Sequence, residues 1–175
     1  MRSSRLASAA LAVTLLTPLA AFAQDVTEPA LKAAFIYTFM KFTQWPEPFP
    51  ASDPFVVCVL GDPSVGDALE RLVKGREFAG RRVAVSIMAV SGSTKPCRVI
   101  YVSGATPTQR AQLLVELQDE SVLTISDLVG FTNAGGMAQF FFERGQLRFS
   151  IGLEAVKRSR LQMSSNLLVL AKRYE

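Results

Sequence analysis

Apolar and polar residues alternate along residues 131–153, and this period of two predicts a β-hairpin. The turn is expected at Glu143 to Gln146, which contains Gly145. If Glu143 faces Gln146, one face of the hairpin is entirely apolar, whereas a slip of one residue would bury Arg148. The apolar pairs are then Phe142 with Leu147, Phe140 with Phe149 and Ala138 with Ile151. We expect these aromatic residues in the core.

The opposite face of the hairpin is polar except for one aromatic residue. It pairs Phe141 with Arg148 and Gln139 with Ser150. Two interpretations of Phe141 stay open: it lies beneath another element of the core, or it stacks on Arg148 as a cation–π pair at a contact surface.

Before the hairpin, short continuous apolar runs predict strands that are buried on both faces of a sheet. Residues 55–60 form such a run, residues 82–87 give a second strand with Val83, Val85 and Ile87 alternating, and residues 99–102 and 122–125 supply a third and a fourth. Asp62-Pro63 and Thr106-Pro107 each place a capping residue before a proline, which predicts a helix start. Because strands alternate with helices, we expect an α/β fold: a single three-layer α/β/α domain with a mostly parallel sheet, extended by the C-terminal antiparallel hairpin.

A helix is also predicted from Pro29 until the chain reaches Pro46, and its residues are apolar on nearly every side. Such a helix is either sandwiched within its own domain or packed on a partner. Two closing helices are expected over residues 153–159 and 164–172.

The first 23 residues have the features of a secretory signal peptide. Arg2 and Arg5 precede an apolar run, and Ala21-Phe22-Ala23 forms a cleavage site. Cleavage after Ala23 leaves residues 24–175 as one domain. No later run is long and apolar enough to span a bilayer, so we expect a periplasmic protein that does not itself cross the membrane.

Composition narrows the function further. The net charge of +4 includes two arginines of the signal peptide and is too weak to indicate nucleic-acid binding. The chain has no histidine, which excludes histidine-based catalytic and zinc sites, and no nucleophile, phosphate-loop or metal-ligand motif is present. We therefore expect no catalytic residues, no metal and no cofactor.

The two cysteines, Cys58 and Cys97, are expected to form a disulfide in an oxidising compartment; the alternative is two buried free thiols. Asp62 and Asp127 follow predicted strands. This position is compatible with a ligand-binding loop at Gly61-Asp62 or with carboxylate-only hydrolysis, although Asp62 is better explained as a helix cap. Gly135-Gly136 precedes a strand, so we interpret it as a turn and not as a phosphate loop.

Several motifs taken together resemble the YfiR family of periplasmic proteins. They are Lys32 to Phe35 with Tyr37, Phe39, Lys41-Phe42 and Trp45-Pro46; Cys58 to Gly61; Cys97; Leu123-Thr124 with Ser126-Asp127; Phe131; Gly135 to Met137; Arg148-Phe149; Ile151; and Leu161 to Ala171. The chain differs from many members at Thr38, Ser150 and Gly152, and it lacks the second cysteine pair of some members.

The resemblance implies a homodimeric, non-enzymatic regulator that binds the periplasmic sensor region of an inner-membrane diguanylate cyclase, inhibits it, and so lowers cyclic di-GMP signalling and biofilm formation. The alternative is a periplasmic small-ligand-binding module. Candidate partner-binding residues are the aromatic, basic or flexible side chains left after the core is assigned. They are Tyr37, Lys41, Trp45, Phe141, Arg148 and Met163.

Overall fold

The computed structural model describes residues 26–46 and 54–172, so the expected signal peptide lies outside the described residues. The elements, in order, are α1 (Glu28–Lys41), β1 (Thr43–Gln44), β2 (Phe55–Leu60), α2 (Pro63–Val73), β3 (Glu77–Phe78), β4 (Arg81–Met88), β5 (Val99–Val102), α3 (Pro107–Glu116), β6 (Leu123–Ser126), β7 (Ala138–Glu143), β8 (Gln146–Ile151), α4 (Leu153–Arg158), β9 (Gln162–Met163) and α5 (Ser165–Leu170).

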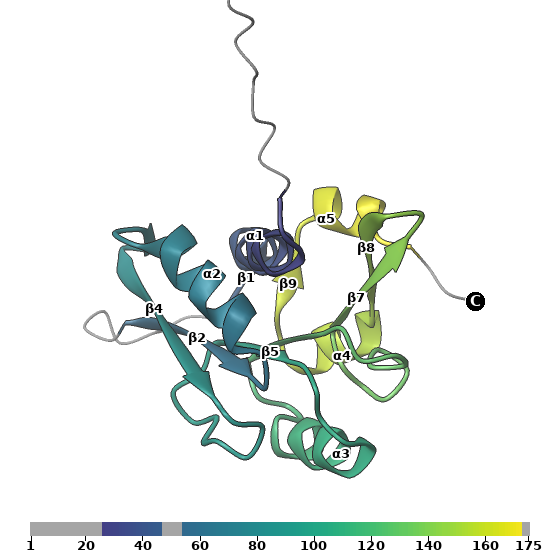
Figure 1. The fold of residues 1–175 in the computed structure, drawn as a ribbon. Helices are drawn as coiled ribbons and strands as arrows, with labels where there is room; N and C mark the ends of the chain where they lie inside the picture. The colour runs from purple at the N-terminus through teal and green to yellow at the C-terminus, as the bar shows by residue number, and fades with distance from the viewer. Residues whose placement is uncertain (1–25, 47–53, 173–175) are drawn as a thin grey trace, which may run out of the picture.

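A seven-stranded sheet in the order β3-β4-β2-β5-β6-β7-β8 organises the fold (Figure 1). Its five inner strands are parallel, and the antiparallel strands β3 and β8 form its two edges. A second, two-stranded antiparallel sheet joins β1 to β9. The predicted α/β fold with a mostly parallel sheet is therefore confirmed, including its extension by a C-terminal hairpin.

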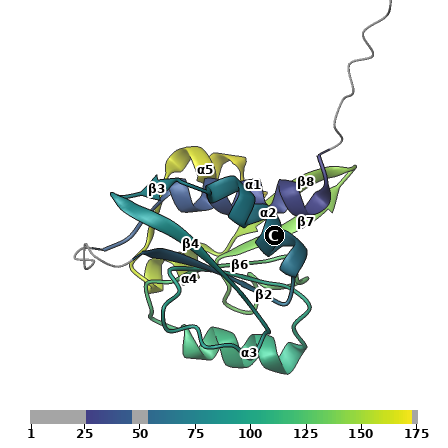
Figure 2. The same ribbon diagram turned by 60° about the vertical axis from the view of Figure 1, so that its left-hand side comes forward.

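Helices cover both faces of the sheet. Figure 2 shows α1 and α2 on one face and α3 on the other. Successive side chains of β2 point to opposite faces of the sheet. Val57 and Val59 pack in the core beneath α1 and α2, whereas Leu60 packs on the other face with Leu113 of α3. The result is two separate apolar cores, one on each face of the sheet.

The disulfide is confirmed. Cys58 in β2 and Cys97, two residues before β5, are bonded and fully buried in the core on the α3 side, with their Cα atoms 5.7 Å apart. The alternative of two free thiols is wrong. The bond links β2 to the residues that lead into its neighbouring strand β5.

The hairpin has the predicted register, from Glu143 opposite Gln146 to Ala138 opposite Ile151. The turn residues Arg144 and Gly145 have φ values of 49° and 76°, as a two-residue turn with two left-handed positions requires.

The predicted burial of the hairpin is wrong at two places. Phe142, predicted in the core, is 46% exposed because it lies next to the turn at the end of the hairpin. Gln139 and Ser150, predicted on a polar face, are buried. The segment before β7 covers this end of the hairpin, and the Gln139 side chain accepts a 2.9 Å hydrogen bond there from the Phe131 N–H.

The first helix is sandwiched within its own domain, as one of the two interpretations predicted. All its residues from Pro29 to Met40 are buried or half-buried. Phe35 and Phe39 contact the rings of Phe140 and Phe149 edge-on, at centroid distances of 4.9–6.1 Å. The α1 helix therefore fastens the hairpin to the rest of the domain.

Candidate functional site

A charged network lies where β5 and β6 end, beneath the N-terminal half of α1. The Lys32 ammonium lies 2.7 Å from Asp127 Oδ2 and 2.6 Å from Glu28 Oε1. The hydroxyls of Tyr101 and Ser103 donate to the same Asp127 oxygen, at 2.9 and 3.2 Å. The Lys32 and Asp127 side chains are only 9% and 21% exposed, so this ion pair is largely withdrawn from water.

The sheet and the helix bring these residues together. Asp127 directly follows β6 and Ser103 directly follows β5, and the carboxyl ends of parallel strands meet at one edge of a sheet. Tyr101 points to the α1 side of β5 because Ile100 and Val102 point to the α3 side. Lys32 is the one charged residue between Pro29 and Met40, so the sequence indicates that it needs a partner of opposite charge. The sequence does not identify that partner, which lies 95 residues away.

The network changes the protonation of its members. Burial alone would raise the pKa of Asp127, but the hydrogen bonds from Lys32, Ser103 and Tyr101 outweigh burial and lower it. Burial alone would lower the pKa of Lys32, yet its bonds to Asp127 and Glu28 raise it. Burial, followed by the Asp127 charge, raises the pKa of Tyr101 well above its ordinary value. The ion pair is therefore charged and the phenol neutral at neutral pH.

Three of the candidate partner-binding residues lie around the C-terminal end of α1. The Lys41 ammonium and the Arg76 guanidinium both lie over the Tyr37 ring, 5.8 and 5.4 Å from its centroid. Lys41 and Trp45 line a hollow of about 400 Å³, which Arg81 also lines. Tyr37, Lys41 and Trp45 were predicted individually, but it was not predicted that they form one basic and aromatic surface with Arg76 and Arg81.

Trp45 is half-buried and serves mainly as core cover. Its indole contacts the rings of Phe55 and Phe78 edge-on, with centroids 5.1 and 5.7 Å away. Its Nε1 is buried without a hydrogen-bond partner among the described residues. Truncating Trp45 would therefore disturb folding as well as any contact.

The other three candidates are not gathered into one site. Met163 lies opposite Thr43 in the small β1–β9 sheet, next to the hollow that Trp45 lines. Phe141 and Arg148 are opposite one another in the hairpin, where Phe141 is half-buried and Arg148 is exposed. The structure thus gives the candidates two locations: the C-terminal end of α1 with β9, and the hairpin.

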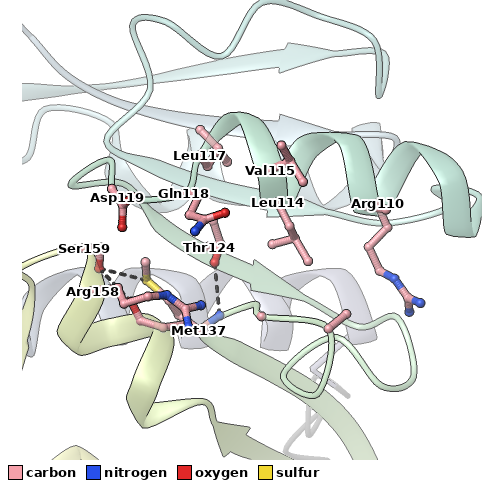
Figure 3. A pocket seen from close by; sticks show the side chains of 14 residues that line it. Arg110, Leu114, Val115, Leu117, Gln118, Asp119, Thr124, Met137, Arg158 and Ser159 are labelled. Atoms are coloured by element: carbon pink, nitrogen blue, oxygen red, sulfur yellow. Dashed lines mark hydrogen bonds between the residues drawn. The ribbon is translucent and has the colours of Figure 1, made fainter.

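Figure 3 shows another pocket, of about 220 Å³, between α3, the segment before β7 and the end of α4. Met137 lies in its wall, where its N–H donates to Thr124 Oγ1 at 3.1 Å and its sulfur lies 3.9 Å from the Ser159 hydroxyl. Its labelled charged residues are two arginines, Arg110 and Arg158, and one aspartate, Asp119, so the lining carries a net positive charge.

The glycine pair and Asp62 have structural roles. Gly136 lies against the Phe131 ring, where a Cβ would come within 2.2 Å of it, and Gly135 has a φ of 102°. The predicted turn is thus confirmed. The Asp62 carboxylate accepts hydrogen bonds from the N–H groups of Ser64 and Val65, so its predicted role as the cap of α2 is also confirmed.

Within residues 26–46 and 54–172, no group of three or more cysteine and carboxylate side chains is placed to hold a metal ion. Among the helices described, none is long and apolar enough to cross a membrane.

Comparison with known proteins identifies the family of this chain. No curated protein is similar enough in sequence to match this chain. The sequence model of the YfiR/HmsC-like family matches residues 29–172, which include every helix and strand except the first residue of α1. The chain therefore belongs to the YfiR/HmsC-like family.

Proposed function

We propose that this protein is a periplasmic regulator that binds the periplasmic sensor region of an inner-membrane diguanylate cyclase and holds the enzyme inactive. Cyclic di-GMP signalling and biofilm formation would fall as a result. The observation that carries this proposal is the family match over residues 29–172. The buried Cys58–Cys97 disulfide supports it, since such bonds persist in oxidising compartments.

The proposed mechanism is binding alone, without chemistry on the partner. A regulator shifts a cyclase toward its inactive conformation only to the extent that it binds that conformation more tightly. A shift from mostly active to mostly inactive, 99:1 to 1:99, requires about a 10⁴-fold preference. We propose that the protein acts as a homodimer, because two copies offer one surface to each subunit of a symmetric partner.

We propose the C-terminal end of α1, with Tyr37, Lys41 and Trp45, as the main contact surface. Tyrosine and tryptophan are common among residues that dominate binding energy, and the exposed Lys41 beside them adds a charge that can steer a partner. Phe141 and Arg148 of the hairpin form a second candidate contact, and Met163 lies beside the first.

The direct test is deletion of the gene followed by measurement of cyclic di-GMP. We expect the level to rise and to return when the gene is restored, and crosslinking to recover a cyclase from the membrane. An unchanged level, with no membrane partner recovered, would contradict the proposal.

Charge reversal tests the contact surface. In the deletion strain, we expect a gene with Lys41→Glu to restore inhibition of the cyclase only weakly, because the change reverses a charge on the proposed contact surface. Lys41 is exposed, so the change leaves the core intact. Lys95→Glu is the matched control, since Lys95 is also an exposed lysine but lies in the loop between β4 and β5. Equal inhibition by both variants would exclude the α1 end as the contact.

A further inference from the structure

A pocket of about 290 Å³ lies at the carboxyl ends of β6 and β7, beside the first turn of α1. Open α/β sheets commonly bind small molecules outside the carboxyl ends of their strands. Its lining includes Glu28, Lys32, Asp127, Val129, Phe141 and Phe142. The pocket is therefore lined by three charged side chains on one side and by phenylalanine side chains of β7 on the other.

The charge of the pocket favours a cation. Its lining holds two carboxylates, Glu28 and Asp127, against the single ammonium of Lys32. Both carboxylates already bind that ammonium, at 2.6 and 2.7 Å. An anion would therefore meet a net negative charge and a lysine whose charge is already balanced.

Unused acceptor atoms are present. The Lys32, Tyr101 and Ser103 donors all reach Oδ2 of Asp127, and Oδ1 accepts no hydrogen bond from the described part of the chain. Water reaches this carboxylate, because the Asp127 side chain is 21% exposed, and the Glu28 side chain is 55% exposed. A charged N–H donor would make strong hydrogen bonds to these oxygens.

The other wall of the pocket is apolar and open to solvent. Phe142 is 46% exposed and Val129 is 87% exposed, and Phe141 lines the pocket beside them. Aromatic rings attract cations as well as apolar groups, so this wall suits the body of a ligand whose charged end meets the carboxylates.

We propose that this pocket binds a small organic cation, a protonated amine on a compact apolar body, with Asp127 and Glu28 as acceptors and Phe141 and Phe142 as the apolar wall. This binding site goes beyond the regulatory role and does not depend on it.

The test uses the purified exported protein and three probes of similar shape. Benzylamine is cationic at pH 7, benzyl alcohol is neutral and benzoate is anionic. We expect calorimetric titration to show saturable binding of benzylamine, with at least about tenfold weaker binding of the other two, as the loss of a charged hydrogen bond implies. Absent binding of benzylamine, or equal binding of all three probes, would overturn the proposal.

Variants locate the binding. We expect Glu28→Gln and Phe142→Ala each to weaken benzylamine binding about fivefold, because each removes one exposed part of the lining. Glu154→Gln is the matched control: Glu154, like Glu28, is an exposed first-turn carboxylate that pairs with a lysine of its own helix. In the amide NMR spectrum, benzylamine should shift the signals of the residues that line the pocket and leave the signals of α4 unchanged. Unchanged affinity in both pocket variants, or an equal loss in the control, would rule out this pocket.

Discussion

Asp127 carries a negative charge in a mostly buried place, and one of its oxygens accepts hydrogen bonds from three donors. The energetic cost of burying this charge is offset by the Lys32 ammonium together with the hydroxyls of Tyr101 and Ser103. The residue therefore links α1 to the end of β6 through charge, in addition to the apolar contacts of the helix.

Replacement of Asp127 by asparagine should lower the free energy of unfolding by about 2 kcal/mol, because it leaves the Lys32 ammonium with only the more exposed Glu28. Chemical denaturation at pH 7 measures this loss. The same change at Asp67, an exposed residue of α2, is the control and should have little effect. Equal stability of both variants would mean that the ion pair contributes nothing net.

The lowered pKa of Asp127 also predicts how stability depends on pH. A carboxyl group whose folded pKa lies below its unfolded value stabilises the fold above the unfolded value, about 3.9, and loses that contribution as pH falls through the folded value. Wild type should therefore lose stability below about pH 4, and Asp127→Asn should lose less over the same range. Parallel curves for the two proteins would contradict this assignment.

For single elements, the hairpin turn carries a prediction about backbone conformation. Gly145 has a φ of 76°, and a Cβ added there would meet no atom within 4 Å. Gly145→Ala should therefore cost about 1 kcal/mol through backbone strain alone. Gly145→Asn should cost less, because asparagine tolerates left-handed conformations better than alanine. Thermal denaturation compares the two, and an equal loss would contradict backbone strain as the cause.

The elements that the sequence predicted are those with a strong local pattern. The runs at 55–60 and 99–102 became β2 and β5 with the expected bounds, and the hairpin pairs agree with the alternation. The two-residue strands β1, β3 and β9 were missed because two residues cannot display a period.

The same reasoning explains the candidate site. Asp62 was identified as a cap because its partners lie two and three residues along the chain. The pairing of Lys32 with Asp127 was not predicted, because it depends on which strands become neighbours and on where α1 lies across them. Charge in an apolar helix signals an unusual environment, but it does not identify the partner.

For the whole molecule, the Cys58–Cys97 bond is the single covalent link between distant parts of the described chain, and it closes a separation of 39 residues. In the chain-entropy model, a loop of this size contributes about 4 kcal/mol. The double change Cys58→Ser and Cys97→Ser should therefore lower the free energy of unfolding by roughly that amount. Denaturation of wild type with and without reductant is the parallel control, and a reduced wild type as stable as the oxidised one would contradict the expectation.

The edges of the large sheet limit how copies of this protein can associate. At one edge β3 has only two residues. At the other, the backbone carbonyl of Phe149 in β8 already accepts a 2.9 Å hydrogen bond from the Lys172 N–H, so an incoming strand would have to displace the C-terminal segment. Strand addition, the usual route from exposed edges to aggregates and fibres, is thus hindered at the β8 edge, whereas β3 pairs with only Arg81 and Arg82 of the eight-residue β4. An assembly that forms on the hairpin side should therefore use side-chain surfaces, which can separate again without unravelling the sheet, and a copy that adds a strand should do so along β4.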